Sequence, residues 1–375
     1  MTTATITCHD VYNYGASLQA FALQQTLVSL GHSNVIIDYK PPYLSNHFSF
    51  SSINSVYDRP FVRWAYFAAK FPERVLALRR KRAFDRFTRR YLTLTEHRYC
   101  SVDELKECAP KADCYIAGSD QIWNTLFKNG KDAAFYLDFV PEGARRVSYA
   151  ASFATEKLHC SPQMASDIVA MLGKFDSISV REKSGKALLE SLGYKACTVT
   201  VDPVFLPDVA IWDKIAEKPS GIGRKRFVLV YDCELGDSLR TAAKSEASAF
   251  DAEICSVNMR KAYADINLPY IGPSQFIWLL QNAECVVTNS FHATAFSLIF
   301  KRPFWVVPRS ENINARMEDL LASTGLSDRM LASDSAPDRP VLEPDFEQAT
   351  AVLEAQRGKS LEFLKKAIVG KDGRC

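Results

Sequence analysis

A histidine with polar neighbours interrupts an apolar stretch in the last third of this 375-residue chain. The segment Cys285–Thr288 suits a buried strand, Ser290 is a residue type that caps helices, and apolar residues then recur at helical spacing as far as Ile299. His292 is therefore expected in the first turn of a helix that follows a strand. Exposed backbone N–H groups favour an anion there, and open α/β sheets bind ligands at the carboxyl ends of their strands. The pattern predicts a phosphate or carboxylate substrate beside His292.

Spacing alone leaves two interpretations of this histidine. A ring in a half-apolar stretch is most often structural, whereas a ring beside a substrate can act as general acid and base because its pKa lies near working pH. Arg181 follows the strand-like Ile178–Val180 and is expected at another carboxyl end. Its planar guanidinium matches carboxylate and phosphate, which makes it the expected donor anchor. The alternative is an ion pair with Glu182 or with a neighbouring helix.

Two turns in the first half of the chain also follow expected strands. Asn13, Tyr14 and Gly15 open a helix at the position of a phosphate-binding turn, although G-x-G-x-x-G is absent and dinucleotide binding is unsupported. The segment 118–121 follows a buried strand, and its Asp120 could orient or deprotonate an acceptor hydroxyl. Trp123 could stack on a sugar ring or fill the wall between domains. The alternative for both turns is structural: glycine for tight geometry and polar residues for capping.

Strands and helices alternate along the chain, which is typical of parallel, doubly wound α/β sheets. Strands are expected at 4–8, 35–39, 114–117, 146–149, 177–180, 227–231, 254–257, 285–288 and 304–307, and helices at 17–29, 184–192 and 343–369. Prolines and glycines cluster between 203 and 223, so we place a domain boundary there. The prediction is a Rossmann-like domain over 1–205, the expected acceptor side, and a second over 206–375, the expected donor side.

Composition fits a two-domain globular protein, with 47% hydrophobic and 24% charged residues. No apolar run approaches the roughly 20 residues that span a bilayer, and no basic region precedes the first strand, so neither a membrane helix nor a signal peptide is expected. Ten cysteines are scattered without a C-x-x-C pair, which indicates buried thiols in a reducing cytoplasm. The six histidines are dispersed, so no metal site is expected.

The net charge of +3 is unevenly distributed, because Arg63–Arg90 carries ten basic residues against two acidic ones. This segment belongs to a basic helical insertion at about 60–95, which Pro72 is expected to split into two short helices. One interpretation is a solvated basic face. The other is contact with anionic lipid headgroups or a lipid-pyrophosphate-linked sugar, hence peripheral attachment at the inner face of the membrane. A nucleic-acid partner is not expected in a chain so close to neutral.

Several blocks together resemble the polysaccharide pyruvyl transferase family. They occur in family order and spacing, although no single block is specific. The blocks are residues 13–23 (NYGASLQAFAL), 118–124 (GSDQIWN), 148–153 (SYAASF), 179–182 (SVRE), 201–203 (VDP), 271–276 (IGPSQF) and 289–297 (NSFHATAFS). The resemblance implies a GT-B-like arrangement, in which two Rossmann-like domains face each other across a cleft. In such arrangements a terminal helix, here about 343–369, often packs back on the first domain.

The resemblance also implies an activity, namely transfer of a pyruvyl group from phosphoenolpyruvate to a sugar residue as a ketal. The acceptor would be a cell-surface polysaccharide or its lipid-linked precursor. Phosphoenolpyruvate would be the donor substrate, and no cofactor is expected. The family's key histidine falls at His292, which would protonate the methylene carbon of the donor. Two alternatives remain open: a nucleotide-sugar glycosyltransferase on the same architecture, and a sugar- or anion-binding relative that has lost catalysis.

The expected site draws on both domains. The catalytic candidates are His292, Arg181 and Asp120. The substrate-binding candidates are Asn13, Tyr14, Gly15, Gly118, Ser119, Gln121, Trp123, Asn289, Ser290 and Arg316. Some family branches carry arginine two residues before the histidine, where this chain has Ser290. A missing anion contact would then fall to another cation, for which the candidates are Lys301, Arg302, Arg309 and Arg316.

Overall fold

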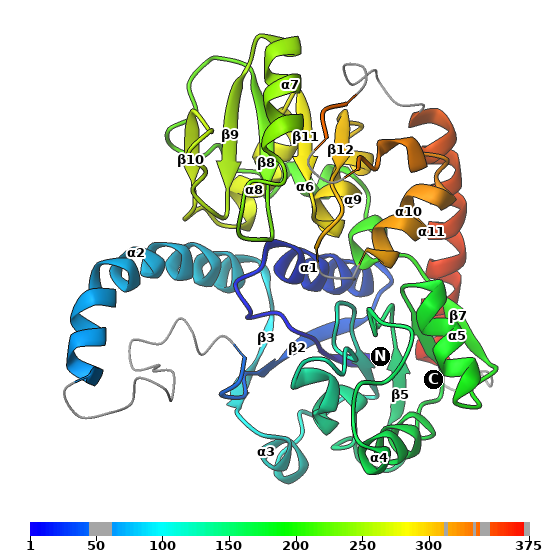
Figure 1. The fold of residues 1–375 in the computed structure, drawn as a ribbon. Coiled ribbons are helices and arrows are strands. Elements are labelled where there is room, and N and C mark those ends of the chain that lie inside the picture. Colours follow the sequence, from blue (N-terminus) through cyan, green and yellow to red (C-terminus); the bar gives the residue numbers. More distant parts are fainter. Residues whose placement is uncertain (45–61, 311–313, 333–334, 338–345, 371–375) are drawn as a thin grey trace.

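Two five-stranded parallel sheets form the frame of the molecule (Figure 1). The computed structural model describes residues 1–44, 62–310, 314–332, 335–337 and 346–370, without the side chains of 62–70 and 72–74. The strand orders are β3-β2-β1-β4-β5 and β10-β9-β8-β11-β12, so each sheet has the same order counted from its own first strand. This order, with helical crossovers, is that of a Rossmann-like domain. The predicted α/β fold class with two doubly wound domains is confirmed.

The first sheet is built from strands that alternate with helices in the first half of the chain. Its strands are β1 (Thr2–Ile6), β2 (Ser33–Tyr39), β3 (Leu94–Tyr99), β4 (Cys114–Ala117) and β5 (Arg145–Ser148), extended by the pair β6 (Ile178–Val180) and β7 (Cys197–Val199). Its helices are α1 (Tyr14–Ser29), α2 (Val62–Tyr91), α3 (Val102–Glu107), α4 (Pro162–Leu172) and α5 (Lys183–Ser191), with short 3-10 turns at Asn129–Lys131, Ala133–Tyr136 and Pro203–Phe205.

The second sheet repeats this pattern. Its strands are β8 (Phe227–Tyr231), β9 (Glu253–Val257), β10 (Ile266–Leu268), β11 (Cys285–Thr288) and β12 (Phe304–Val306). Its helices are α6 (Ala210–Asp213), α7 (Arg240–Phe250), α8 (Pro273–Asn282), α9 (Phe291–Ile299), α10 (Ala315–Ser323) and α11 (Phe346–Val369), with a 3-10 turn at Ser327–Arg329. None of the described helices combines the length and apolarity that a bilayer crossing requires.

The two domains share an aromatic contact at the start of α1. The ring of Tyr14 is fully buried and stacks on Phe276 of α8, with ring centroids 4.4 Å apart, and on Phe84 of α2 at 5.2 Å. The Tyr14 hydroxyl donates a hydrogen bond to the carbonyl of Ile271 at 3.3 Å. Figure 1 shows α1 lying between the two sheets. Because aromatic stacking fixes both separation and orientation, this contact positions the beginning of α1 against the second domain.

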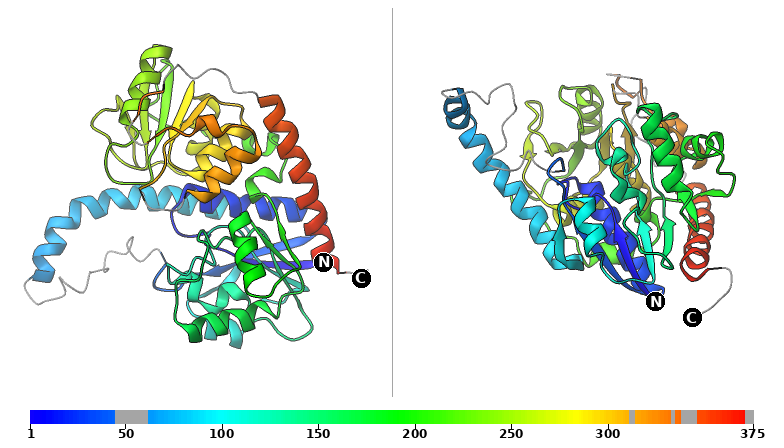
Figure 2. Two further views of the ribbon diagram at one scale, coloured as in Figure 1. Left: turned by 45° about the vertical axis from the view of Figure 1, so that its right-hand side comes forward. Right: turned by 90° about the horizontal axis from the view of Figure 1, so that it is seen from below.

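The last described helix, α11, runs from the second domain to the first (Figure 2). Near its end, Leu364 and Ile368 pack with Leu23 and Ile116 in one buried cluster. Nε of Arg145 donates a hydrogen bond to the carbonyl of Ala367 at 3.1 Å. Residues 343–345 of the predicted terminal helix lie outside the described residues, as do residues 60–61 of the predicted basic insertion.

The predicted break at Pro72 is wrong, because α2 is one helix from Val62 to Tyr91. Proline removes one backbone hydrogen bond and bends a helix, but the helix continues when neighbouring turns keep their bonds. In Figure 1 the first part of α2, in deeper blue, is bent relative to the rest of the helix. This part projects beyond the body of the molecule.

Candidate functional site

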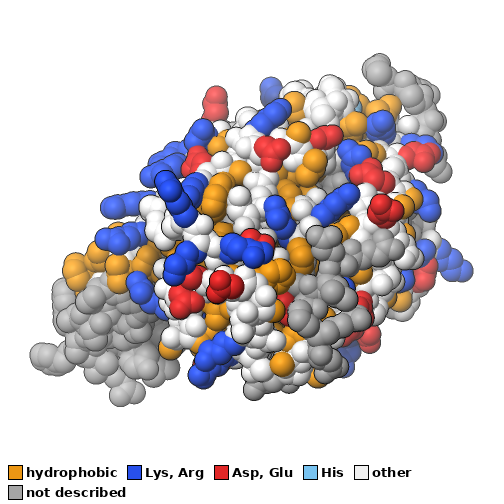
Figure 3. All heavy atoms as spheres, turned by 90° about the horizontal axis from the view of Figure 1, so that it is seen from above, with side chains coloured by type: hydrophobic (Ala, Val, Ile, Leu, Met, Phe, Trp, Pro, Cys, Tyr) orange, Lys and Arg blue, Asp and Glu red, His pale blue; other side chains and the backbone are white. Residues whose placement is uncertain are grey.

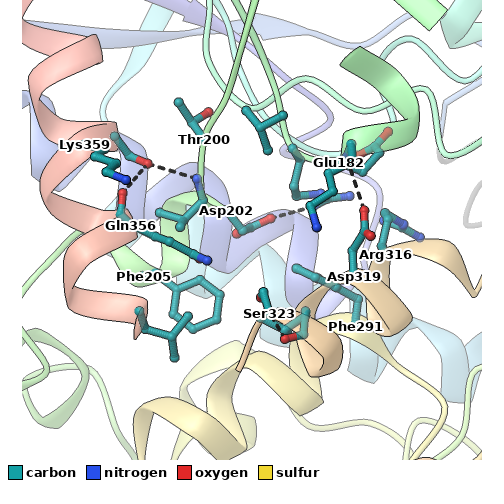
Figure 4. Close-up of a pocket in the computed structure, with 17 residues that line it drawn as sticks. Glu182, Thr200, Asp202, Phe205, Phe291, Arg316, Asp319, Ser323, Gln356 and Lys359 are labelled. Atoms are coloured by element: carbon teal, nitrogen blue, oxygen red, sulfur yellow. Dashed lines mark hydrogen bonds and ion pairs between the residues drawn. The ribbon is translucent and has the colours of Figure 1, made fainter. Parts of the chain in front are cut away.

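Two neighbouring cavities lie where the domains meet, and both reach Phe291 and Arg316. The larger, here called the His292 cavity, has a volume of about 390 Å³. It is lined by Cys8, Val11, Asn13, Leu44, Asp120, Gln121, Phe127, Asn129, Cys233, Asn289, Ser290, Phe291, His292, Arg309, Arg316 and Met317. The smaller, here called the Asp202 cavity, has a volume of about 280 Å³ and lies between α5, α10 and α11. Figure 4 shows it, with Asp202, Phe291 and Arg316 around the space and Gln356 and Lys359 across from them.

Two helix N-termini, one from each domain, open on the His292 cavity. Asn13 caps α1 by accepting a hydrogen bond from the backbone N–H of Ala16 at 3.2 Å. Ser290 caps α9 in the same way through the N–H of Ala293 at 3.5 Å. Both cap residues line the cavity. A helix N-terminus carries a partial positive charge and uncapped N–H groups, so two of them at one cavity favour an anionic ligand.

The imidazole of His292 reaches from α9 of the second domain to Gly15 and Asp202 of the first. A Cβ placed on Gly15 would lie only 2.0 Å from its Nδ1, so glycine is the only residue that leaves room for the ring. On the other side, Nε2 lies 3.6 Å from Oδ2 of Asp202. This Nε2 is buried and has no hydrogen-bond partner within the described part of the chain. The ring is therefore held in position while Nε2 is left without a close partner.

Asp202 connects the residues around it and is fully buried. Its Oδ2 accepts a hydrogen bond from Nη1 of Arg181 at 2.5 Å, and its Oδ1 accepts one from the N–H of Val204 at 3.1 Å. Burial raises the pKa of Asp202, but the charges of His292 and Arg181 outweigh it, so the pKa lies well below the ordinary range. The sequence interpretation missed Asp202 as a site residue, because an aspartate before a proline in a turn is usually a cap.

Arg181 pairs with Asp202 and not with Glu182, its neighbour in sequence. Glu182 is held instead by the backbone N–H groups of Phe153 and Ala154, at 2.9 and 3.0 Å. The ion pair with Glu182 that the sequence left open is therefore not formed. The Arg181 guanidinium lies 4.8 Å from the ring centroid of Phe291 and lines the Asp202 cavity. Its Nε and Nη2 are buried with no hydrogen-bond partner among the described residues.

Arg316 of α10 is the cation that reaches both cavities. Its guanidinium also lies near the Phe291 ring, 5.8 Å from the centroid, and the residue is 8% exposed. Its Nε is buried, and the described residues offer it no hydrogen bond or ion pair. Burial and the nearby charge of Arg181 lower the pKa of Arg316 to about 10. A buried cation without a counterion is costly, and an anionic ligand would remove that cost.

Asp120 brings a carboxylate to the cavity from the first domain. It follows β4, and its side chain is 18% exposed. Its φ of 75° lies in the left-handed region that non-glycine residues rarely adopt, although Asp tolerates it better than most. Oδ1 of Asp120 lies 3.9 Å from Nη2 of Arg181. Strained backbone at such a position is common where a side chain must be aimed at a ligand.

The structure divides the remaining predicted residues into two groups. Gln121 and Asn289 line the His292 cavity. Tyr14, Gly118, Ser119 and Trp123 line neither cavity. Trp123 is fully buried in the first domain, where its Nε1 donates a hydrogen bond to the carbonyl of Phe135 at 3.0 Å. Ser119 lies behind the site, with its Oγ 3.4 Å from Oδ2 of Asp202.

Of the four cations considered for the missing anion contact, two are at the cavity and two are remote. Arg309 and Arg316 line the His292 cavity. Lys301 and Arg302 follow the C-terminal end of α9, whereas His292 is in its first turn. In the part of the chain that the structure describes, no three His, Cys, Asp or Glu side chains are grouped so as to hold a metal ion.

This arrangement can bind a small anion and move protons at it. His292 can exchange a proton at a substrate atom, and Asp202 can stabilise its protonated form. Arg316, Arg309 and the two helix N-termini supply positive charge. Asp120 approaches from the opposite domain as a second acid–base group.

Comparison with known proteins gives a family and a fold. The model of the family "Polysaccharide pyruvyl transferase" matches residues 13–311. Among curated proteins, none matches the sequence significantly. UDP-GlcNAc 2-epimerase from Neisseria meningitidis bound to UDP-GlcNAc is similar in structure, with a TM-score of 0.50, 10% identity and coverage of 98% of this chain and 100% of the other. An Arabidopsis thaliana protein complexed with UDP-L-rhamnose also has a TM-score of 0.50, with 11% identity and 98% of each chain covered. These neighbours show the GT-B-like fold.

Proposed function

The chain belongs to the polysaccharide pyruvyl transferase family, and on that premise we propose that it transfers the pyruvyl group of phosphoenolpyruvate to two hydroxyls of a sugar residue. The product would be a pyruvate ketal on a cell-surface polysaccharide or its lipid-linked precursor. The observation that carries the proposal is the position of His292. It lies at a cavity where positive charge gathers from two helix N-termini and from Arg316, which has no ion pair among the described residues. Phosphoenolpyruvate carries a phosphate and a carboxylate, which suit that charge.

In the proposed reaction His292 first acts as a general acid. The protonated imidazole gives its proton to the methylene carbon of phosphoenolpyruvate, which leaves an oxocarbenium-like centre at C2. Asp202 would stabilise the imidazolium before this step, because its carboxylate is fully buried and 3.6 Å from Nε2. The donor's own negative charges favour the same protonated state.

Two sugar hydroxyls then complete the ketal. The first attacks C2 and forms a C–O bond, and Asp120 accepts its proton. The second hydroxyl attacks C2 as the bond between C2 and the phosphate oxygen breaks. Its proton returns to the now neutral His292. The proton held by Asp120 passes to the oxygen of the departing phosphate, so hydrogen phosphate leaves and Asp120 is ionised again. Phosphoenolpyruvate and a diol thus become a ketal and phosphate without any oxidant, reductant or cofactor.

The test is acceptor-dependent release of phosphate from phosphoenolpyruvate, with a panel of nitrophenyl and lipid-linked glycosides. His292→Ala should abolish the release, whereas His97→Ala, at an exposed position in β3, should leave it unchanged. A thermal-shift titration separates this function from nucleotide-sugar transfer. A ligand at 100 times its dissociation constant adds about 2.7 kcal/mol of stability. Stabilisation by UDP-sugars and not by phosphoenolpyruvate, with no phosphate release, would replace the proposal with glycosyl transfer.

A further inference from the structure

A single stripe of arginines covers the outer face of α2. Arg79, Arg82, Arg86 and Arg89 are all exposed. At 3.6 residues per turn their side chains fall within about 80° of arc and extend over about 15 Å of the helix. None of the four has a hydrogen bond or an ion pair to the described residues. The stripe is therefore an exposed row of four arginines, none of which pairs with an acidic side chain among the described residues.

Apolar side chains continue the same stripe toward the projecting end of the helix. Val75 is 41% exposed and Phe71 is 58% exposed. Val75 lies on the helix face at the centre of the arginine row, within about 40° of each of the four arginines. Figure 3 shows Lys and Arg side chains gathered along the left edge of the molecule, beside hydrophobic ones. A basic row that ends in exposed apolar groups is the composition of a surface that lies on a charged interface.

The opposite face of α2 fixes this surface to the rest of the protein. Phe84 and Phe87 are buried in the main core. Nη1 of Arg80 donates a hydrogen bond to Oδ1 of Asn258 in the second domain, and its Nη2 donates one to the carbonyl of Tyr12 at 2.9 Å. Tyr12 directly precedes Asn13, which lines the His292 cavity. The exposed stripe is thus held rigidly about one helix diameter, or roughly 10 Å, from residues that lead into the cleft.

We propose that the outer face of α2, from Phe71 to Arg89, docks on the surface of an anionic phospholipid bilayer. The positive row matches the negative headgroups, and Val75 and Phe71 can enter the boundary between headgroups and acyl chains. A partner bound by charge alone would not bury these two apolar side chains. A second copy of the chain is a poor occupant, because it would bring two rows of arginines together. Nucleic acid is disfavoured by the net charge of only +3 and by the apolar end of the stripe. If the proposed function holds, docking would bring the cleft to a lipid-linked sugar.

Vesicle co-sedimentation tests the docking without any substrate. The full chain is mixed with phosphatidylcholine vesicles with or without phosphatidylglycerol, at low and at high salt. We expect binding only to the anionic vesicles, weakened by salt because exposed charges are screened. Each arginine near such a surface contributes about five-fold in affinity, so a variant with Arg79→Gln, Arg82→Gln and Arg86→Gln should bind about a hundred-fold more weakly.

The matched control removes three positive charges elsewhere. Arg224→Gln, Arg240→Gln and Lys244→Gln change exposed residues of the second domain by the same net charge, and this variant should bind vesicles like the wild type. Equal losses in both variants would overturn the proposal by showing that binding follows net charge alone. Absence of binding to anionic vesicles at low salt would overturn it too, as would displacement from vesicles by duplex DNA. Because no substrate is present, each outcome is independent of pyruvyl transfer.

Discussion

Replacing Gly15 with alanine tests directly whether the position of His292 matters. The new Cβ would lie 2.0 Å from Nδ1, 2.3 Å from Cγ and 2.5 Å from Cε1 of the imidazole. Ordinary van der Waals contact begins at 3.4 Å. The ring and the methyl group must therefore separate by about 1.4 Å, either through movement of the ring or through opening of the domain contact. Both responses change the distance from Nε2 to Asp202.

The expected cost falls on catalysis and not on folding. A misplacement of about 1 Å in a catalytic group costs on the order of a hundred-fold in rate, which corresponds to about 2.7 kcal/mol of transition-state stabilisation. Gly15 is in the first turn of α1 without a left-handed φ, so alanine is compatible with its backbone. Alanine also favours the helical state over glycine by up to about 1 kcal/mol, which offsets part of the steric cost. We expect kcat/KM for phosphate release to fall about a hundred-fold, with a melting temperature near that of the wild type.

Gly358→Ala is the matched control. Gly358 also lies inside a helix, α11, and a Cβ there would meet no atom within 4 Å. It should therefore gain the same helix propensity and keep full activity. Both variants are compared by thermal denaturation and by the phosphate-release assay. If Gly15→Ala folds normally and keeps the wild-type kcat/KM, the position of the His292 ring against Gly15 does not control catalysis.

Three further substitutions probe the charges of the site. Asp202→Asn should destabilise the protein at pH 7 by about 3 kcal/mol, because it removes the buried carboxylate that forms the closest ion pair of Arg181. The folded-state pKa of Asp202 is lowered, so the stability that its carboxylate provides is present above the unfolded pKa of about 4 and is lost as pH falls further. Urea denaturation from pH 7 to pH 3 should therefore show the difference in unfolding free energy between wild type and variant becoming smaller. A difference that stays constant with pH would contradict the ion pair. Arg316→Met should raise the stability of the free protein by about 1–3 kcal/mol and remove the thermal shift caused by phosphoenolpyruvate. A variant that keeps this thermal shift would show that Arg316 does not bind the donor. Asp120→Gly should relieve the strain of the left-handed φ and raise the melting temperature, whereas Asp120→Asn should leave the melting temperature unchanged. Both variants should lower kcat. Full activity in either variant would show that Asp120 takes no part in the reaction.

The amino-acid sequence alone was sufficient to predict the family and the fold class. The blocks from Asn13 to the His292 segment identified the family, and alternating strands and helices predicted two parallel, doubly wound domains; both predictions are confirmed. Local signals also placed His292 in the first turn of a helix after a strand, where α9 has it. These features depend on the period of apolar residues and on capping, which neighbours in sequence determine.

Which residues meet in space was decided by the tertiary structure. His292 contacts Gly15, 277 positions earlier in the chain, and faces Asp202, which sequence interpretation treated only as part of a motif. Trp123 was expected beside a substrate and is buried in the first domain. Such contacts follow from how two independently patterned sheets pack across α1. The spacing of residues in the sequence does not predict this packing, because side chains from distant segments meet only when both domains are folded.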